Sequence, residues 1–153
     1  MPNFDAYDRH ILRLLQSDAR QTNRALAAAV GLAPSTTLDR VRELERQGAI
    51  VGYHARVDLG ALSRPLQAMV AVRIRPKTQQ IVDAFVDAVW SLPETLSVSL
   101  TSGQDDILVH LSVADTDSLR RIVLDKIASL PGVVDERTSL VFEHRRKQVV
   151  EPA

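Results

Sequence analysis

The stretch from Asn23 to Gly48 constrains the fold of this chain most, because its residue types predict two short helices joined by a tight turn. Its first half carries small and apolar residues at helical spacing, namely Leu26, Ala27 and Val30. Gly31 can adopt the left-handed backbone that ends a helix. Pro34 suits the first turn of the next helix, since its fixed φ is helical and its missing N–H needs no partner there.

On the second helix of this pair, apolar and polar residues separate onto different faces. The apolar residues that we expect to face a core are Leu38, Val41 and Leu44. The other face carries groups that can touch base edges and phosphates. These candidate DNA-binding residues are Ser35, Thr36, Asp39, Arg40, Arg42 and Arg46. An ordinary helical hairpin with a solvated charged face would show the same pattern, so this stretch alone leaves both interpretations open.

The flanking residues extend this unit on both sides. Phe4–Ser17 predicts a supporting helix that Asp5 can cap. After Gly48, the stretch Ala49–Val57 has the β-branched and aromatic content of a short strand. We therefore expect residues 1–57 to form a helix-turn-helix, winged-helix-like DNA-binding domain, followed by a linker at residues 58–65.

The second half of the chain changes its hydrophobic period. Alternating strands and helices predict the order βαββαβ, the ferredoxin-like arrangement of an α+β domain, over residues 66–146, with a tail at 147–153. The expected elements are strand Leu66–Arg75, helix Thr78–Leu92, strands Thr95–Thr101 and Ile107–Ala114, helix Thr116–Leu130 and strand Thr138–Glu143.

The two faces of the expected sheet differ in composition. The apolar set that belongs under the helices is Ala68, Val70, Val72, Ile74, Leu96, Val98, Leu100, Ile107, Val109, Leu111 and Val113. The opposite face holds Met69, Ala71, Arg73, Ser97, Ser99, Thr101, Leu108, His110 and Ser112. This mixture is too poor in charge for a wholly solvated face, and we infer that a second subunit covers it in a symmetric dimer.

Many residues at fixed spacing match one known family. They are Phe4, Asp5, Asp8, Ile11, Leu12, Asp18, Ala19, Arg20, Leu26, Ala27, Gly31, Leu32, Pro34, Ser35, Thr36, Arg40, Val41, Leu44, Glu45, Gly48, Ile50, Gly52, Tyr53 and Ala55. On these residues the chain resembles the Lrp/AsnC, or feast/famine, transcription regulators. The resemblance implies a double-stranded DNA operator and a C-terminal ligand-sensing domain. It also implies dimers that pair sheet to sheet and commonly assemble further, often to octamers.

The chain departs from the family pattern on the second helix of the pair. Ala33 stands where a serine usually caps that helix, which should cost about 1 kcal/mol unless another group substitutes. Thr37 replaces a more apolar inward residue. Asp39 and Glu43 stand where the family often carries basic groups, so phosphate attraction rests on Arg40, Arg42 and Arg46.

The loop Thr101–Asp106 is the second candidate site. From its residues alone it reads as a plain hairpin turn. The resemblance implies an effector loop that binds an amino acid between dimers: Asp106 would accept from the ammonium or shape the loop, and backbone N–H groups around Gly103 would bind the carboxylate. Gln104 and Asp105 depart from the motif there. The candidate effector-binding residues are Ser102, Gly103, Gln104, Asp106, Thr138 and Ser139.

Composition excludes several classes of function. The chain of 153 residues has no cysteine, so disulfides, thiolate catalysis and sulfur-based zinc sites are excluded. No apolar run reaches the roughly 20 residues that span a bilayer, and no signal peptide is recognisable, so we expect a cytoplasmic protein without membrane contact. The net charge is zero, and residues 1–60 carry eight arginines against seven acidic residues, which predicts weak non-specific DNA affinity.

No enzymatic signature appears in the sequence. The four histidines lack metal-ligand spacing, and there is no phosphate loop, serine elbow or catalytic carboxylate pair. We expect a homo-oligomeric, amino-acid-responsive transcription regulator, neither an enzyme nor a metal or cofactor protein. Two alternatives remain: a ligand-binding enzyme or carrier built on the ferredoxin-like domain, and a chromatin-organising DNA binder with little sequence preference.

Overall fold

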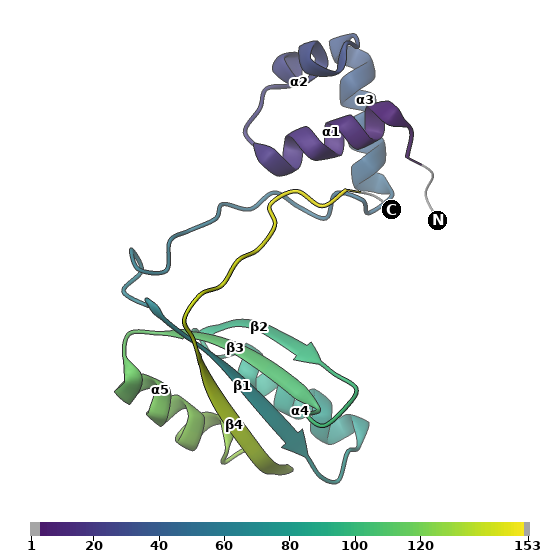
Figure 1. Cartoon of the computed structure of the whole chain (residues 1–153). Helices are drawn as coiled ribbons and strands as arrows, with labels where there is room; N and C mark the ends of the chain where they lie inside the picture. The colour runs from purple at the N-terminus through teal and green to yellow at the C-terminus, as the bar shows by residue number, and fades with distance from the viewer. Residues whose placement is uncertain (1–3, 152–153) are drawn as a thin grey trace. The chain divides into compact units, whose positions relative to one another are not determined.

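The computed structural model describes residues 4–151 and divides the chain into two compact units (Figure 1). The first unit contains the residues up to Arg56 together with those from Arg145 onward, and the second runs from Val57 to His144. The chain therefore passes between the units twice.

The first unit is a bundle of three helices, α1 (Ala6–Ser17), α2 (Asn23–Val30) and α3 (Pro34–Arg46). A capping box begins α1, because Asp5 accepts from the Asp8 N–H and the Asp8 carboxylate accepts from the Asp5 N–H. Gly31 ends α2 with φ of 74°, the left-handed conformation expected of it. The buried core is Ile11, Leu26, Val30 and Leu44, so the helix pair and its support are confirmed.

Two details of this unit differ from the sequence prediction. The expected strand Ala49–Val57 is absent: residues 51–57 form no ladder with any described strand, and Val51 is 91% exposed. A segment with β propensity becomes a strand only where another strand supplies its hydrogen bonds. Leu38 is also exposed, because the buried side of α3 is centred on Thr37, Val41 and Leu44 instead.

The second unit is a four-stranded antiparallel sheet with its helices on one face (Figure 1). The strand order is β2-β3-β1-β4. Its elements are β1 (Leu66–Ile74), α4 (Gln79–Trp90), β2 (Thr95–Leu100), β3 (Ile107–Val113), α5 (Thr116–Ile122) continued by the π-helix η1 (Val123–Ile127), and β4 (Val133–Val141). The βαββαβ order is confirmed, although the last strand begins at Val133, earlier than the expected Thr138.

The helix-facing side of the sheet is closely packed. Its central residues are at most 1% exposed: Ala68, Val70, Val72, Ile74, Ile107, Val109, Leu111 and Val113. Two members of the predicted set are wrong, since Leu96 is 37% and Leu100 62% exposed. Both lie on β2, an outer strand that pairs only with β3 and carries a register shift between Thr95 and Ser97.

After β4 the chain returns to the first unit and packs on α1. The side-chain amide of Gln16 donates to the Val150 carbonyl at 3.0 Å and accepts from the Val150 N–H at 2.9 Å. Gln148 donates to the Ser17 carbonyl at 2.9 Å. These contacts join residues near opposite ends of the sequence, and no local pattern predicts them.

Replacing Ala33 by serine should stabilise the start of α3 by about 0.5–2 kcal/mol, because a serine hydroxyl there accepts from a first-turn N–H. Ala33 makes no side-chain cap, and its φ of −65° and ψ of 146° already suit a capping residue. Hydrogen exchange of the α3 amides in the intact chain measures this gain.

The matched control is Ala29→Ser, which makes the same change at an exposed position within α2. It should cost a few tenths of a kcal/mol through lower helix propensity, roughly 0.5 at most. Unchanged exchange of the α3 amides in Ala33→Ser would contradict the prediction.

Candidate functional site

The outer face of α3 is polar, and most of its charges are paired along the helix. Ser35 and Thr36 are exposed in its first turn, beside N–H groups that no side chain caps. Arg42 lies 3.9 Å from Asp39, with both side chains more than two-thirds exposed. Arg46 lies 2.5 Å from Glu43, and hydrogen bonds from Arg46 and Gln47 lower the Glu43 pKa to about 2. Exposed pairs of this kind contribute little to stability and exchange partners easily.

Arg40 has intramolecular partners that its position in the sequence does not predict. Its Nη1 donates to Asp5 at 2.8 Å and to Asp8 at 2.7 Å, and its guanidinium lies 5.3 Å from the ring centroid of Tyr7. The Asp5 pKa is lowered, first by the hydrogen bond from the Asp8 N–H and then by Arg40. Only 30% of the Arg40 side chain is exposed. In the free protein Arg40 therefore ties α3 to the start of α1, and its role as a base reader stays a prediction.

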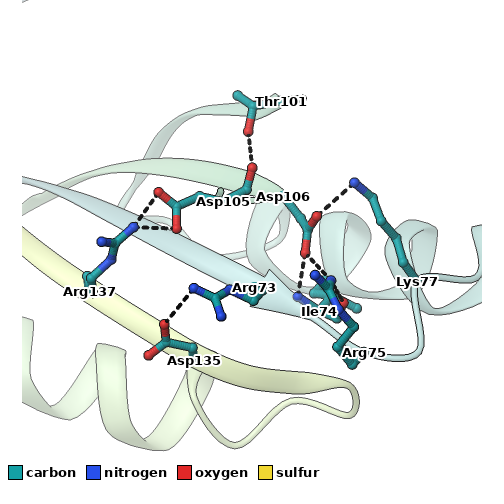
Figure 2. Close-up of polar contacts among 9 residues, drawn as sticks. All are labelled: Arg73, Ile74, Arg75, Lys77, Thr101, Asp105, Asp106, Asp135 and Arg137. Atoms are coloured by element: carbon teal, nitrogen blue, oxygen red, sulfur yellow. Dashed lines mark hydrogen bonds and ion pairs between the residues drawn. The ribbon is translucent and has the colours of Figure 1, made fainter. Parts of the chain in front are cut away.

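Asp106 is the buried charge of the second unit. Its side chain is 4% exposed, and its carboxylate accepts from the Ile74 N–H at 2.8 Å, from Arg75 at 2.9 Å and from Lys77 at 2.7 Å (Figure 2). The Lys77 hydrogen bond, followed by that of the Ile74 N–H, lowers the Asp106 pKa to about 2. This nearly buried carboxylate, bound by three donors, shapes the loop in the free protein, and a direct contact with a ligand stays a prediction.

The loop that Asp106 anchors is closed at its base and open at its tip. Thr101 donates from its hydroxyl to the Asp105 carbonyl at 2.6 Å and from its N–H to the Asp106 carbonyl at 2.9 Å. The tip residues Ser102, Gly103 and Gln104 are all exposed. Gly103 has φ of 138°, a conformation that favours glycine.

The two hydroxyl residues of β4 do not share a surface. Ser139 pairs with Met69 and Thr138 with Val70, and successive strand residues point to opposite faces of a sheet. Thr138 borders an apolar cavity beside α5 on the helix-facing side, and its hydroxyl donates to Glu136 at 3.0 Å. Ser139 lies on the outer face. The effector-binding role of either residue, which the resemblance places across an interface between subunits, stays a prediction.

The sequence analysis missed one pair in this region. Arg137 on β4 donates from one Nη2 to both carboxylate oxygens of Asp105, at 2.5 and 2.6 Å (Figure 2). Beside this ion pair, Arg73 Nη2 lies 3.4 Å from Asp135 Oδ2. Alternation along β4 puts Arg137 and Ser139 on the same outer face, but no local pattern identifies Asp105 as the partner of Arg137.

Two histidines lie side by side although their positions in the sequence are far apart. The ring centroids of His110 and His144 are 5.2 Å apart. His110 is 8% exposed and its Nε2 has no partner among the described residues. Burial, and then the charge of His144, lower the His110 pKa. Across residues 4–151, no group of three or more histidine or carboxylate side chains could hold a metal ion.

None of the described helices is both long and apolar enough to cross a membrane.

Comparisons with known proteins agree with both units. A family model of winged helix-turn-helix DNA-binding matches residues 4–51, and the model of the Lrp/AsnC ligand binding domain matches residues 67–150. The HTH-type transcriptional regulator AldR of Mycobacterium tuberculosis is 38% identical over 93% of this chain and 79% of its own length. The leucine-responsive regulatory protein of Escherichia coli K12 is 38% identical over 92% of this chain and 86% of its own.

A solved structure extends the likeness to the whole chain. The transcriptional regulator of Neisseria meningitidis in complex with L-Met superposes with a TM-score of 0.90 at 32% identity, over 98% of this chain and 97% of that one. A helix-turn-helix unit joined to a ligand-binding domain defines a DNA-binding transcription regulator, which is a non-enzymatic role. The chain belongs to the Lrp/AsnC family.

Asp106→Asn should make the second unit less stable near neutral pH, by about 1–2 kcal/mol, because it removes a buried charge that three donors bind. A carboxylate whose pKa is lower in the folded than in the unfolded protein stabilises the fold at pH values above its unfolded pKa. This contribution is lost as the pH falls through the folded pKa. The difference between wild type and variant should therefore shrink between about pH 4 and pH 2. Urea unfolding at several pH values measures it.

Asp135→Asn is the matched control, since it removes a half-exposed carboxylate paired with Arg73. It should change stability by less than about 1 kcal/mol at any pH. A stability difference for Asp106→Asn that does not depend on pH would contradict the anchoring role of its charge.

Proposed function

We propose that this protein regulates transcription by placing α3 on double-stranded operator DNA and by changing its DNA affinity when an amino acid binds to the loop at residues 102–106. The observation that supports it best is the polar outer face of α3, on a unit that matches the DNA-binding family model. The ligand-binding match over residues 67–150, and the L-Met bound to the related structure, support the amino acid.

On DNA, the first turn of α3 and its outer arginines have separate roles in this proposal. Ser35 and Thr36, with the uncapped N–H groups beside them, contact base edges and phosphate at the helix N-terminus. Arg42 and Arg46 exchange their carboxylate partners for DNA phosphates, while the carboxylates of Asp39 and Glu43 repel the phosphates. This balance gives weak non-specific binding and leaves discrimination to base contacts.

Arg42→Ala should weaken binding to all DNA sequences alike and lower the slope of log affinity against log salt by about 1, because one phosphate contact is lost. Fluorescence anisotropy on DNA from upstream of the protein's own gene, over a salt series, measures both effects. Arg121→Ala on α5 removes the same charge from the other unit and serves as the control. An Arg42→Ala variant with the wild-type salt slope would exclude Arg42 as a phosphate contact.

The proposed assembly is a homo-oligomer of dimers, up to an octamer, in the cytoplasm where operator DNA lies. The outer face of the sheet supports pairing of copies, since Met69, Ala71 and Leu108 lie there without a covering helix. A symmetric dimer presents two copies of α3 to one face of the duplex.

Binding to two half-sites should then depend on their helical phase. Half-sites should lie about one turn, roughly 10 base pairs, or a multiple of it apart, so insertion of about half a turn should weaken binding sharply. Gel shifts on matched operators with half-turn and whole-turn insertions test this. Equal affinity for both insertions would favour the chromatin-organising alternative, in which spacing is irrelevant.

In the effector site of this proposal, Asp106 is an anchor and the exposed tip is the binding surface. Backbone N–H groups of residues 102–104 are available to a carboxylate, with the side chains of Ser102 and Gln104 beside them. Ser139 suits the site better than Thr138, because it lies on the outer face with Arg137.

A further inference from the structure

The C-terminal tail carries a run of basic side chains that the contacts of α3 leave without a role. Arg145, Arg146 and Lys147 follow one another directly after His144, and all three are exposed. Within residues 4–151, neither Arg146 nor Lys147 has a hydrogen-bond acceptor or a carboxylate as partner. The tail belongs to the first unit, so these two free cations are part of the unit that contains α3.

The residues that follow the basic run are held on α1. Gln148 donates to the Ser17 carbonyl at 2.9 Å, and Val150 forms two hydrogen bonds with the Gln16 side-chain amide, at 3.0 and 2.9 Å. Lys147 is therefore next to an anchored residue, near the C-terminal turn of α1. A cation on a segment that is already held loses less conformational freedom on binding than one on a free chain end.

The two units differ in charge, although the chain as a whole is neutral. Residues 1–56 carry eight basic against six acidic side chains, and residues 145–153 add three basic and one acidic, so the first unit has a net charge of +4. The second unit carries eight basic against twelve acidic side chains, a net charge of −4. The tail thus supplies half of the net positive charge of the unit that binds DNA.

The helix α3 contributes no net charge of its own, because it contains three arginines and three acidic residues. Each of its arginines already faces a carboxylate: Arg42 and Arg46 face partners on the same helix, and Arg40 faces Asp5 and Asp8. A DNA phosphate must compete with these carboxylates for the arginines of α3. The cations of the tail have only water to give up.

We propose that the tail is a second DNA contact of this protein, in which Arg146 and Lys147 bind phosphates of the duplex that α3 contacts. This inference rests on the proposed binding of operator DNA and adds to it a contact outside α3. Phosphate contacts carry no sequence information, so the tail raises the affinity for any duplex and leaves discrimination to α3.

The test is the double variant Arg146→Gln/Lys147→Gln of the intact protein. Fluorescence anisotropy over a salt series compares its binding to DNA from upstream of the protein's own gene and to a shuffled duplex of equal length. The slope of log affinity against log salt should fall by about 2, since each phosphate contact contributes about 0.9. Both duplexes should lose the same factor, about 10- to 60-fold at 0.1 M salt, and the loss should narrow as salt rises.

Two further variants separate the contact from general electrostatics and test the anchor. Arg120→Gln/Lys126→Gln makes the same charge change at exposed positions of α5 and η1, and should keep the wild-type salt slope. Gln16→Ala keeps every charge but removes the hydrogen bonds to Val150. It should weaken binding to both duplexes by about 2- to 10-fold, because the tail must then be ordered on binding.

The possible failures are distinct. If the wild-type protein binds neither duplex, the proposed DNA binding is wrong and this inference with it. If the wild type binds and Arg146→Gln/Lys147→Gln keeps its salt slope, DNA binding stands and the tail contact is overturned. With an unchanged slope, a lower urea midpoint would assign the charges to the C-terminal end of α1, and a changed sedimentation coefficient would assign them to contacts between copies.

Discussion

The carboxylate of Asp106 is the interaction on which the ligand-binding unit depends. It lies immediately before β3, and by accepting from the Ile74 N–H it ties the start of this strand to the end of β1. Arg75 and Lys77 supply the charge that makes its burial tolerable. Because the base of the loop is fixed in this way, its tip and the Asp105–Arg137 pair have a defined position above the sheet.

Periodicity and turn chemistry were sufficient to predict the three N-terminal helices, the βαββαβ order and most of the buried sheet face, because each follows from residues a few positions apart. Long-range pairs were not predictable in this way. The partners of Arg40 lie 32 and 35 residues away, in α1 and at its N-cap, and Asp105 lies 32 residues from Arg137. A charged residue on an outward helical face looks the same in sequence whether it meets DNA or another helix. The prediction of a strand after Gly48 was wrong for a related reason, because strand propensity does not specify a partner strand.

The two units are joined by two passages of the chain, one before β1 and one after β4. The second passage follows β4, the strand that carries Arg137. Beyond it, Val150 forms two hydrogen bonds with Gln16 of α1. The tail that follows β4 is thus part of the first unit, and its hydrogen bonds to Gln16 lie within that unit. A ligand changes DNA affinity only if it binds two states of the protein differently.

The central claim is that effector and DNA bind to one coupled protein, and reciprocal affinity measurements test it most directly. The account predicts that the effector changes operator affinity by some factor, and that saturating operator changes effector affinity by the same factor, on the order of 5- to 150-fold for typical allosteric coupling. Both factors are measured by calorimetry and anisotropy on the same preparation. Effector binding that leaves operator affinity unchanged, with operator equally without effect on effector affinity, would contradict the account.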